Sequence, residues 1–398
     1  MSRQADETSS IARVLYVVWT YPKYSETFVR NELLSLRSSG CDVRVATVGD
    51  GQWALPPEEE MSVIRVGKLP GLPRFRDIRG LREFAEDSLL TSMWAPMAAR
   101  RVFSSLNGWR PDVIHVHFID KPALLGLHLA RLAHAPVTIT AHARDYLCHV
   151  SSDVLSRRVL AADQVFAISS AAAGEIEGIL GASSQPKRQI RVVRASASFR
   201  PSPIRLFNDP YVLTIARLVE KKGLETSICA FAIVAAEEPA LQYLIVGDGP
   251  ERESLTALVD DLGLSRKVHF LGARAAQHVQ ALMRDATAFV LCCRESKDGD
   301  VDGIPVVLME AGLAGTPVVT TAVGGISELV TAGISGVVLR PDDVESTADG
   351  LRMILREPAT AAAYAAALHA RVLDEFDIEL QRRRLVESWS ELAGCIHG

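Results

Sequence analysis

The sequence predicts an α/β protein made of two doubly wound domains, each a parallel sheet with helices on both faces. The chain has 398 residues, more than one hydrophobic core usually accommodates. Short runs rich in valine, isoleucine and leucine alternate with longer amphipathic stretches through both halves of the chain. Repetition of strand, helix and strand in this order is typical of parallel sheets, whose strands are apolar on both faces.

The first half supplies the first sheet. Residues 1–10 are polar and are predicted to be disordered. Residues 13–20 (RVLYVVWT) are predicted to form a strand that is buried on both faces, and the helix after it runs to about Ser38 and stops at Gly40. Further strands are predicted at 43–48, 62–66, 112–117, 136–141, 164–168 and 189–194, with a helical stretch at 78–106.

The second half repeats the pattern after a break. Two prolines and several polar residues at 198–205 predict the interdomain linker. The predicted domains are therefore 11–200 and 201–374, and a last helical segment, 375–398, is expected to pack back on the first domain. Strands of the second domain are predicted at 211–216, 241–246, 267–271, 288–292, 317–321 and 336–339. Ligands are expected in a cleft at the carboxyl ends of both sheets.

Composition narrows the class of protein. Apolar residues make up 48% and charged residues 23%, and the net charge is -5, so a nucleic-acid partner is not expected. The six cysteines show no paired metal spacing and fit reduced thiols in a cytoplasm. We find no signal peptide and no apolar run near the ~20 residues that span a bilayer. Because neither half has Gly-x-Gly-x-x-Gly after its first strand, no dinucleotide cofactor is expected.

The segment from Arg294 to Val330 has the features of a ligand site. The segment follows an apolar run, and a helix pattern begins within it at Pro305. The backbone from Gly303 to Val306 would offer free N–H groups to an anion or to sugar hydroxyls. Asp302 lies just before this helix and Glu310 lies inside it, and carboxylates suit a diol because each accepts hydrogen bonds from two hydroxyls. A solvated loop followed by an ordinary amphipathic helix is the alternative.

Two cations mark the start of the second domain. Arg217 ends its first predicted strand, and Lys222 begins the helix after it. Attraction between unit charges ~4 Å apart is about 4 kcal/mol at an effective dielectric constant of 20, enough to stabilise a leaving diphosphate. A solvated basic turn is the alternative.

Taken together, these segments resemble a known family. The motifs are, in order, Arg217-Leu-x-x-x-Lys222-Gly223, Val246-Gly-Asp-Gly-Pro250, Asp302-Gly-Ile-Pro305 with Glu310, and Gly324-Gly325 with Glu328. They resemble the second domain of the retaining glycosyltransferases of family 4, which have the GT-B fold. The first half resembles, more loosely, the branch of that family that builds exopolysaccharides. That likeness rests on Tyr21-Pro-x-x-Ser25-Glu26-Thr27-Phe28 and Asp112-Val-Ile-His115-Val-His117.

The resemblance implies roles for particular residues. Arg217 and Lys222 would hold the donor diphosphate, Glu310 the ribose diol, and Asp302 with Gly303, Ile304, Pro305 and Val306 the sugar. The base would be read by the backbone near Gly272 to Arg274. Asp302 stands where the family has glutamate, so its shorter side chain affects its reach to the sugar hydroxyls.

The first half offers candidates for the sugar and for the acceptor. His142 follows the 136–141 strand, and in the family the corresponding histidine lies beside the donor sugar. Ser25, Glu26, His117 and Arg144 are candidates for contact with the acceptor. The alternatives are a histidine that hydrogen-bonds to nearby backbone and a Ser25 that caps a helix.

We do not expect a metal site. His115 and His117 alternate on one strand and so share a face, but the sequence shows no third ligand for them. Asp298-Gly-Asp300 imitates the Asp-x-Asp motif of metal-dependent glycosyltransferases, but the two cations already supply neutralising charge. His115 is therefore assigned to the core, and the two acids are assigned to a solvated loop.

The favoured function is retaining transfer of a sugar from a nucleoside-diphosphate sugar to a glycan, lipid-linked or small-molecule acceptor, without a metal and by attack on the front face. A sugar-nucleotide epimerase and a degenerate nucleotide-sugar-binding subunit are the alternatives. Residues 65–110 hold nine basic side chains against four acids, so this patch would either rest on anionic lipid or form a solvated helix face. The expected location is the cytoplasm, with any membrane contact peripheral.

Overall fold

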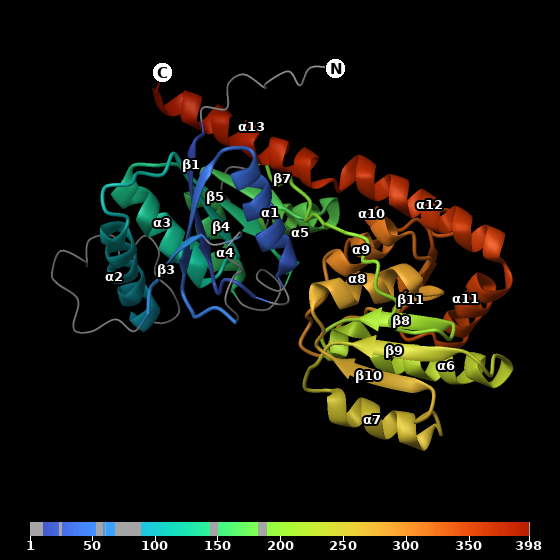
Figure 1. Cartoon of the computed structure of the whole chain (residues 1–398). Coiled ribbons are helices and arrows are strands. Elements are labelled where there is room, and N and C mark those ends of the chain that lie inside the picture. The colour runs from blue at the N-terminus through green and yellow to red at the C-terminus, as the bar shows by residue number, and fades with distance from the viewer. Residues whose placement is uncertain are drawn as a thin grey trace, which may run out of the picture. The chain divides into compact units, whose positions relative to one another are not determined.

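The computed structural model describes residues 11–23, 26–52, 59, 61–67, 89–143, 150–181 and 189–397. The chain folds into two compact units, shown in Figure 1. Unit 1 comprises Met1–Arg194 and Ile378–Gly398, and unit 2 comprises Ala195–Asp377. The sequence analysis placed the first boundary at 200/201 and the start of the last segment at 375.

Unit 1 is built on a seven-stranded sheet in the order β3-β2-β1-β4-β5-β6-β7. The strands are β1 (Arg13–Val18), β2 (Asp42–Thr47), β3 (Ser62–Arg65), β4 (Val113–His117), β5 (Val137–Ala141), β6 (Gln164–Ala167) and β7 (Arg191–Val192). Every pair is parallel. The strand order reverses between β1 and β4, and a reversal of this kind is where a doubly wound sheet places its ligands.

The helices of unit 1 are α1 (Thr27–Ser38), α2 (Leu89–Ser105), α3 (Lys121–Ala133), α4 (Ser152–Ala161), α5 (Ser170–Gly181) and α13 (Ile378–His397). The helix predicted at 78–106 corresponds to α2, and its first part lies outside the described residues. Although α13 is the last element of the chain, it belongs to this unit. Trp389 of α13 is fully buried and donates a hydrogen bond of 3.0 Å to Thr138 of β5.

Unit 2 is built on a six-stranded parallel sheet in the order β10-β9-β8-β11-β12-β13. The strands are β8 (Tyr211–Ile215), β9 (Gln242–Val246), β10 (Val268–Gly272), β11 (Ala288–Leu291), β12 (Val318–Thr321) and β13 (Val337–Leu339). The helices are η4 (Glu220–Lys222, a 3-10 turn), α6 (Leu224–Glu237), α7 (Arg252–Asp261), α8 (Ala276–Asp285), α9 (Val306–Ala314), α10 (Ile326–Leu329), α11 (Val344–Arg356) and α12 (Pro358–Glu375).

The core of unit 2 lies on both faces of its sheet. Val212 and Leu213 are neighbours on β8, yet they belong to different hydrophobic clusters, because successive side chains of a strand point to opposite faces. This two-sided burial explains why the strands are continuous apolar runs, and it confirms the predicted doubly wound α/β fold. Across the part of the chain that the structure describes, no helix is long and apolar enough to cross a membrane.

Candidate functional site

The loops after β8 and β11 meet at one edge of the unit 2 sheet. The two strands are neighbours and run parallel, so their carboxyl ends lie at the same edge. Arg217 follows β8, and Asp302 lies in the loop between β11 and α9. Lys222 ends the 3-10 turn η4 instead of opening helix α6, which corrects the predicted helix start. The sheet order therefore brings together residues about 80 positions apart in the chain.

Asp302 is held between two lysines. Its Oδ2 lies 2.8 Å from Nζ of Lys222 and its Oδ1 lies 3.3 Å from Nζ of Lys221, which also lies 3.0 Å from Oδ1 of Asp300. Burial disfavours the charged carboxylate, but the two ammonium groups outweigh it and lower the pKa of Asp302 to about 2. In turn, burial works against the Lys222 charge, but Asp302 outweighs it and raises the pKa of Lys222. Both groups of this pair are therefore charged at neutral pH.

Arg217 is the exposed cation of this cluster. Within the described ranges it forms no ion pair, and its charge lowers the pKa of Lys222, so the two cations lie close enough to repel each other. Lys222 already has an acidic partner, whereas the Arg217 guanidinium is available to an anionic ligand. The sequence analysis treated both cations alike and missed Lys221, which is 7% exposed and shares the Asp302 carboxylate.

Two glycines of the motifs allow the backbone segments around this cluster to approach closely. Gly223 has φ +59, and a Cβ atom there would lie 1.8 Å from the carbonyl oxygen of Cys292. Gly324 has φ +54, and its Cβ would lie 2.1 Å from the carbonyl oxygen of Asp302. Any other residue at Gly223 would push the Lys222 turn away from the β11–α9 loop, and any other residue at Gly324 would push the β12–α10 loop away from Asp302.

Helix α9 begins next to this cluster. Pro305 is its N-cap residue, and no side chain caps its first turn. Ile304 is buried, Val306 opens the helix, and the carbonyl oxygen of Gly303 accepts a hydrogen bond of 2.9 Å from the N–H of Gly325. The first N–H groups of α9 are thus not used by a capping side chain, which suits an anion or a hydroxyl.

Glu310 lies inside α9 and is half-buried. Burial raises the pKa of this carboxyl to about 7. The folded protein therefore keeps the Glu310 proton up to about pH 7, whereas the unfolded chain loses it near its ordinary pKa of 4.5. The sign follows from linkage: Glu310 lowers the free energy of unfolding as the pH rises through this window.

Replacement of Glu310 by glutamine should therefore stabilise the ligand-free protein at pH 8 by about 1–2 kcal/mol and have little effect at pH 4. Thermal unfolding of both proteins at the two pH values measures the difference. A difference in Tm that does not change with pH would show that Glu310 is not perturbed in this way.

Gly272 and Arg274 lie at the carboxyl end of β10. Gly272 has φ +68 and accepts a hydrogen bond of 3.0 Å from the N–H of Gly247, and Arg274 is exposed. In this parallel sheet, β10 is separated from β8 by β9 alone, so both residues lie at the same sheet edge as Arg217. Their contact with a nucleotide base stays a prediction.

In unit 1, His117 and His142 lie at the carboxyl ends of β4 and β5. Nδ1 of His117 lies 3.1 Å from Nε2 of His142. Burial is the main cause that holds the pKa of His142 well below its usual value. The electrostatic effects of His117, His115 and Lys23 lower the pKa further, so the His142 imidazole is neutral. Glu26 is the N-cap residue of α1 and forms an ion pair with Lys23. Ser25 and Arg144 lie outside the described residues.

The sequence analysis missed Glu32 of α1. Its Oε1 accepts a hydrogen bond of 2.6 Å from the Tyr16 hydroxyl and lies 3.0 Å from Nε2 of His117. Burial disfavours the charge, but His117, His115 and Tyr16 outweigh it and lower the pKa of Glu32. A signal was present in the sequence, because Glu32 lies three residues after Val29 and four before Leu36, both buried in α1, and so shares their apolar face.

Comparison with known proteins identifies the family. Residues 199–369 match the family model described as Glycosyl transferases group 1, and residues 25–195 match the Glycosyl transferase 4-like domain. The chain belongs to the group 1 glycosyltransferases. This membership confirms the predicted resemblance and shows that the protein is a glycosyltransferase.

Individual relatives of this group 1 glycosyltransferase agree with the predicted branch. WcaL of Escherichia coli (strain K12), a glycosyltransferase assigned to colanic acid biosynthesis, is 28% identical over 370 residues, and the match covers 85% of this chain and 89% of WcaL. The amylovoran biosynthesis glycosyltransferase AmsK of Erwinia amylovora is 32% identical over 182 residues, 46% of this chain and 45% of AmsK.

A solved structure agrees on the fold of this glycosyltransferase. HepE of Anabaena in complex with UDP and glucose has a TM-score of 0.73 at 21% identity, with 96% of this chain and 99% of HepE covered. This likeness confirms the GT-B fold. Residues 68–88 of the basic 65–110 patch lie outside the described residues, and the contact of this patch with a membrane stays a prediction.

Proposed function

We propose that this glycosyltransferase binds a nucleoside-diphosphate sugar in unit 2 and transfers the sugar with retention of the anomeric configuration. The cluster of Arg217, Lys222 and Asp302 beside the start of α9 is the observation that carries the proposal. Its cations would hold the donor diphosphate and stabilise the charge that grows on it as the sugar leaves. No metal at the diphosphate is needed in this scheme, since the two cations and the helix N-terminus supply the positive field.

Asp302 supports attack on the front face of the sugar. A carboxylate that receives two ammonium groups is a weak nucleophile, and its low pKa reflects that stabilisation. In our proposal the acceptor hydroxyl forms its bond to the anomeric carbon on the face from which the diphosphate leaves. An oxygen of the leaving phosphate takes the hydroxyl proton, so no covalent enzyme intermediate forms. Asp302 holds Lys222 in place and accepts hydrogen bonds from the sugar.

The remaining site residues complete the donor and acceptor sites. Glu310 would accept hydrogen bonds from the ribose diol, and the backbone at Gly272 and Arg274 would contact the base. His142 would contact the donor sugar, and His117 and Glu26 would contact the acceptor. HepE binds UDP, and WcaL and AmsK are assigned to exopolysaccharide biosynthesis. A nucleotide sugar and a glycan or lipid-linked acceptor are therefore the first substrates to test.

Thermal shift with UDP, GDP, ADP and the corresponding nucleotide sugars tests the donor site. We expect one nucleoside diphosphate to raise Tm, and we expect Arg217→Ala to weaken its binding by about tenfold, since a hydrogen bond to a charged group contributes roughly 1.5–3 kcal/mol. Incubation of the sugar donor without acceptor should leave the nucleotide sugar unchanged. A new nucleotide sugar would indicate an epimerase, and the absence of any nucleotide-induced shift would contradict the proposal.

A further inference from the structure

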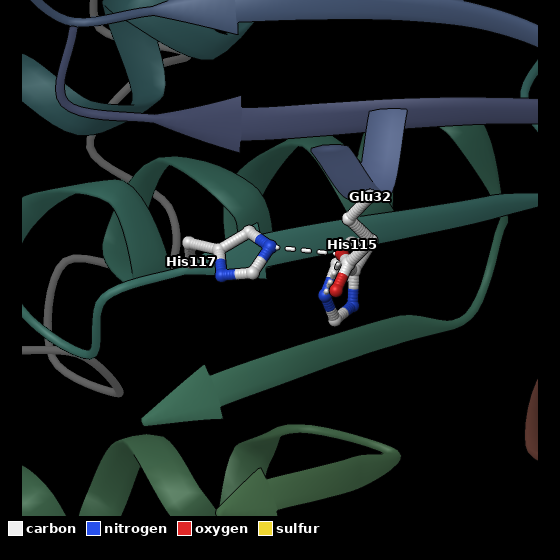
Figure 2. Close-up of side chains that lie close together, drawn as sticks. All are labelled: Glu32, His115 and His117. Atoms are coloured by element: carbon white, nitrogen blue, oxygen red, sulfur yellow. Dashed lines mark hydrogen bonds and ion pairs between the residues drawn. The ribbon is translucent and has the colours of Figure 1, made fainter. Parts of the chain in front are cut away.

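A cluster of one acid and two histidines lies at the switch point of the unit 1 sheet (Figure 2). Glu32 projects from α1, and His115 and His117 project from β4. The two histidines are 0% and 1% exposed. One ligand atom from each of the three residues lies within 4.8 Å of the other two. The third ligand that the sequence analysis did not find is thus supplied by a helix more than 80 residues away in the chain.

Each histidine has its Nε2 atom near the same carboxylate oxygen of Glu32. Nε2 of His117 lies 3.0 Å from Oε1 of Glu32, and Nε2 of His115 lies 3.7 Å from the same atom. Ligands that bind Zn²⁺ tetrahedrally at about 2.0–2.1 Å stand about 3.3–3.4 Å apart. Binding of an ion would draw the three ligand atoms, which lie within 4.8 Å of one another, to this closer spacing. The Thr140 hydroxyl, 3.2 Å from Nε2 of His115, would turn away to release that nitrogen.

The histidine nitrogens that point away from the three ligand atoms already have hydrogen-bond partners, as the ligands of a metal site do. Nδ1 of His115 lies 2.8 Å from the Thr138 hydroxyl, and Nδ1 of His117 lies 3.1 Å from Nε2 of His142. The Tyr16 hydroxyl donates to Glu32. Histidines that bind metals almost always donate their second ring N–H to such a partner, which fixes the tautomer that leaves the first nitrogen free.

The negative charge of the Glu32 carboxylate needs compensation. The Glu32 side chain is 18% exposed, and a carboxylate withdrawn from water to this extent is costly unless a positive charge or several donors compensate it. Among the residues that the structure describes, the ion-pair partners of Glu32 are these two histidines, and no lysine or arginine reaches it. The positive charge must then come from a proton on a histidine or from a bound cation.

We propose that Glu32, His115 and His117 bind one divalent transition-metal ion of the Zn²⁺ class. Two imidazole nitrogens and one carboxylate oxygen suit Zn²⁺ or Co²⁺, whereas Mg²⁺ and Ca²⁺ prefer oxygen ligands alone. The ion would tie α1 to β4 and stabilise unit 1. The site shares His117 with the proposed acceptor site, whereas the residues proposed to hold the donor diphosphate lie in unit 2.

Titration of the untagged full-length protein with Co²⁺, after removal of metals with a chelator, tests the site. We expect about one Co²⁺ per chain, with the visible spectrum of a four- or five-coordinate ion and without thiolate charge-transfer bands. Zn²⁺ should displace the Co²⁺ and raise Tm. Glu32→Gln should weaken binding by at least about tenfold, and Tyr16→Phe, which keeps all three ligands, by roughly 10–100-fold.

His269→Gln is the matched control, because His269 is a half-buried histidine of β10 that hydrogen-bonds to Gln242 and lies outside the cluster. It should bind Co²⁺ as the wild type does. If Glu32→Gln does not fold, the Co²⁺ affinity of Tyr16→Phe still tests the proposal. Three results would overturn the proposal: no Co²⁺ binding by the wild type, a thiolate spectrum that places the ion on cysteine, or equal affinity in the wild type and both cluster variants.

Discussion

Replacement of Lys222 by alanine should lower the turnover of sugar transfer by more than about tenfold. In the proposed mechanism the Lys222 ammonium donates to the leaving diphosphate, and a charge-assisted hydrogen bond of this kind contributes ~1.5–3 kcal/mol, where about 1.4 kcal/mol is tenfold in rate. Steady-state transfer at saturating donor measures the effect. Unchanged turnover would contradict the proposed role of this lysine.

Two controls separate this effect from charge and from stability. Lys297→Ala removes a positive charge from the neighbouring β11–α9 loop, but its side chain is 92% exposed, so turnover should not change. Removal of Lys222 also leaves the half-buried Asp302 with one ammonium partner fewer, which destabilises the fold. The double variant Lys222→Met with Asp302→Asn removes both members of the pair. It should recover most of the lost Tm and stay inactive.

Replacement of Trp389 by alanine should lower the free energy of unfolding by about 3–5 kcal/mol. The side chain is fully buried in the core of unit 1, and its indole N–H donates to Thr138. The variant therefore loses apolar burial, opens a cavity and removes a buried hydrogen bond. Urea unfolding followed by circular dichroism measures the loss.

Glu391→Ala is the control on the same helix. Glu391 forms an ion pair of 2.7 Å with Arg191, but the Arg191 and Glu391 side chains are 40% and 54% exposed, so the cost should stay below about 1 kcal/mol. Trp389→Phe keeps most of the apolar contact and loses only the N–H, so its effect should fall between the two. Equal unfolding curves for wild type and Trp389→Ala would mean that α13 does not contribute to the core of unit 1.

Part of the candidate site was predictable because its motifs are local. Gly223 follows Lys222 directly, and Pro305 and Glu310 lie within one loop and one helix, so spacing alone places them near each other. The Asp302 ion pairs were not predictable in this way. Lys221 and Lys222 meet Asp302 only because β8 and β11 are neighbours in the sheet. The sequence therefore indicated a diphosphate clamp but not that Lys222 already has an acidic partner.

The class of the fold and the positions of its strands follow from the amino-acid sequence alone. Continuous apolar runs such as 13–18 and 211–215 can be satisfied only by strands buried on both faces, and their alternation with helices requires parallel sheets. Which side chains meet was decided by the tertiary structure alone. Glu32 of α1 reaches His115 and His117 of β4, and Tyr16 of β1, across the fold of unit 1, and Trp389 reaches Thr138 because α13 returns to unit 1. Contacts of this range depend on strand order and helix packing, and no periodicity along the chain encodes them.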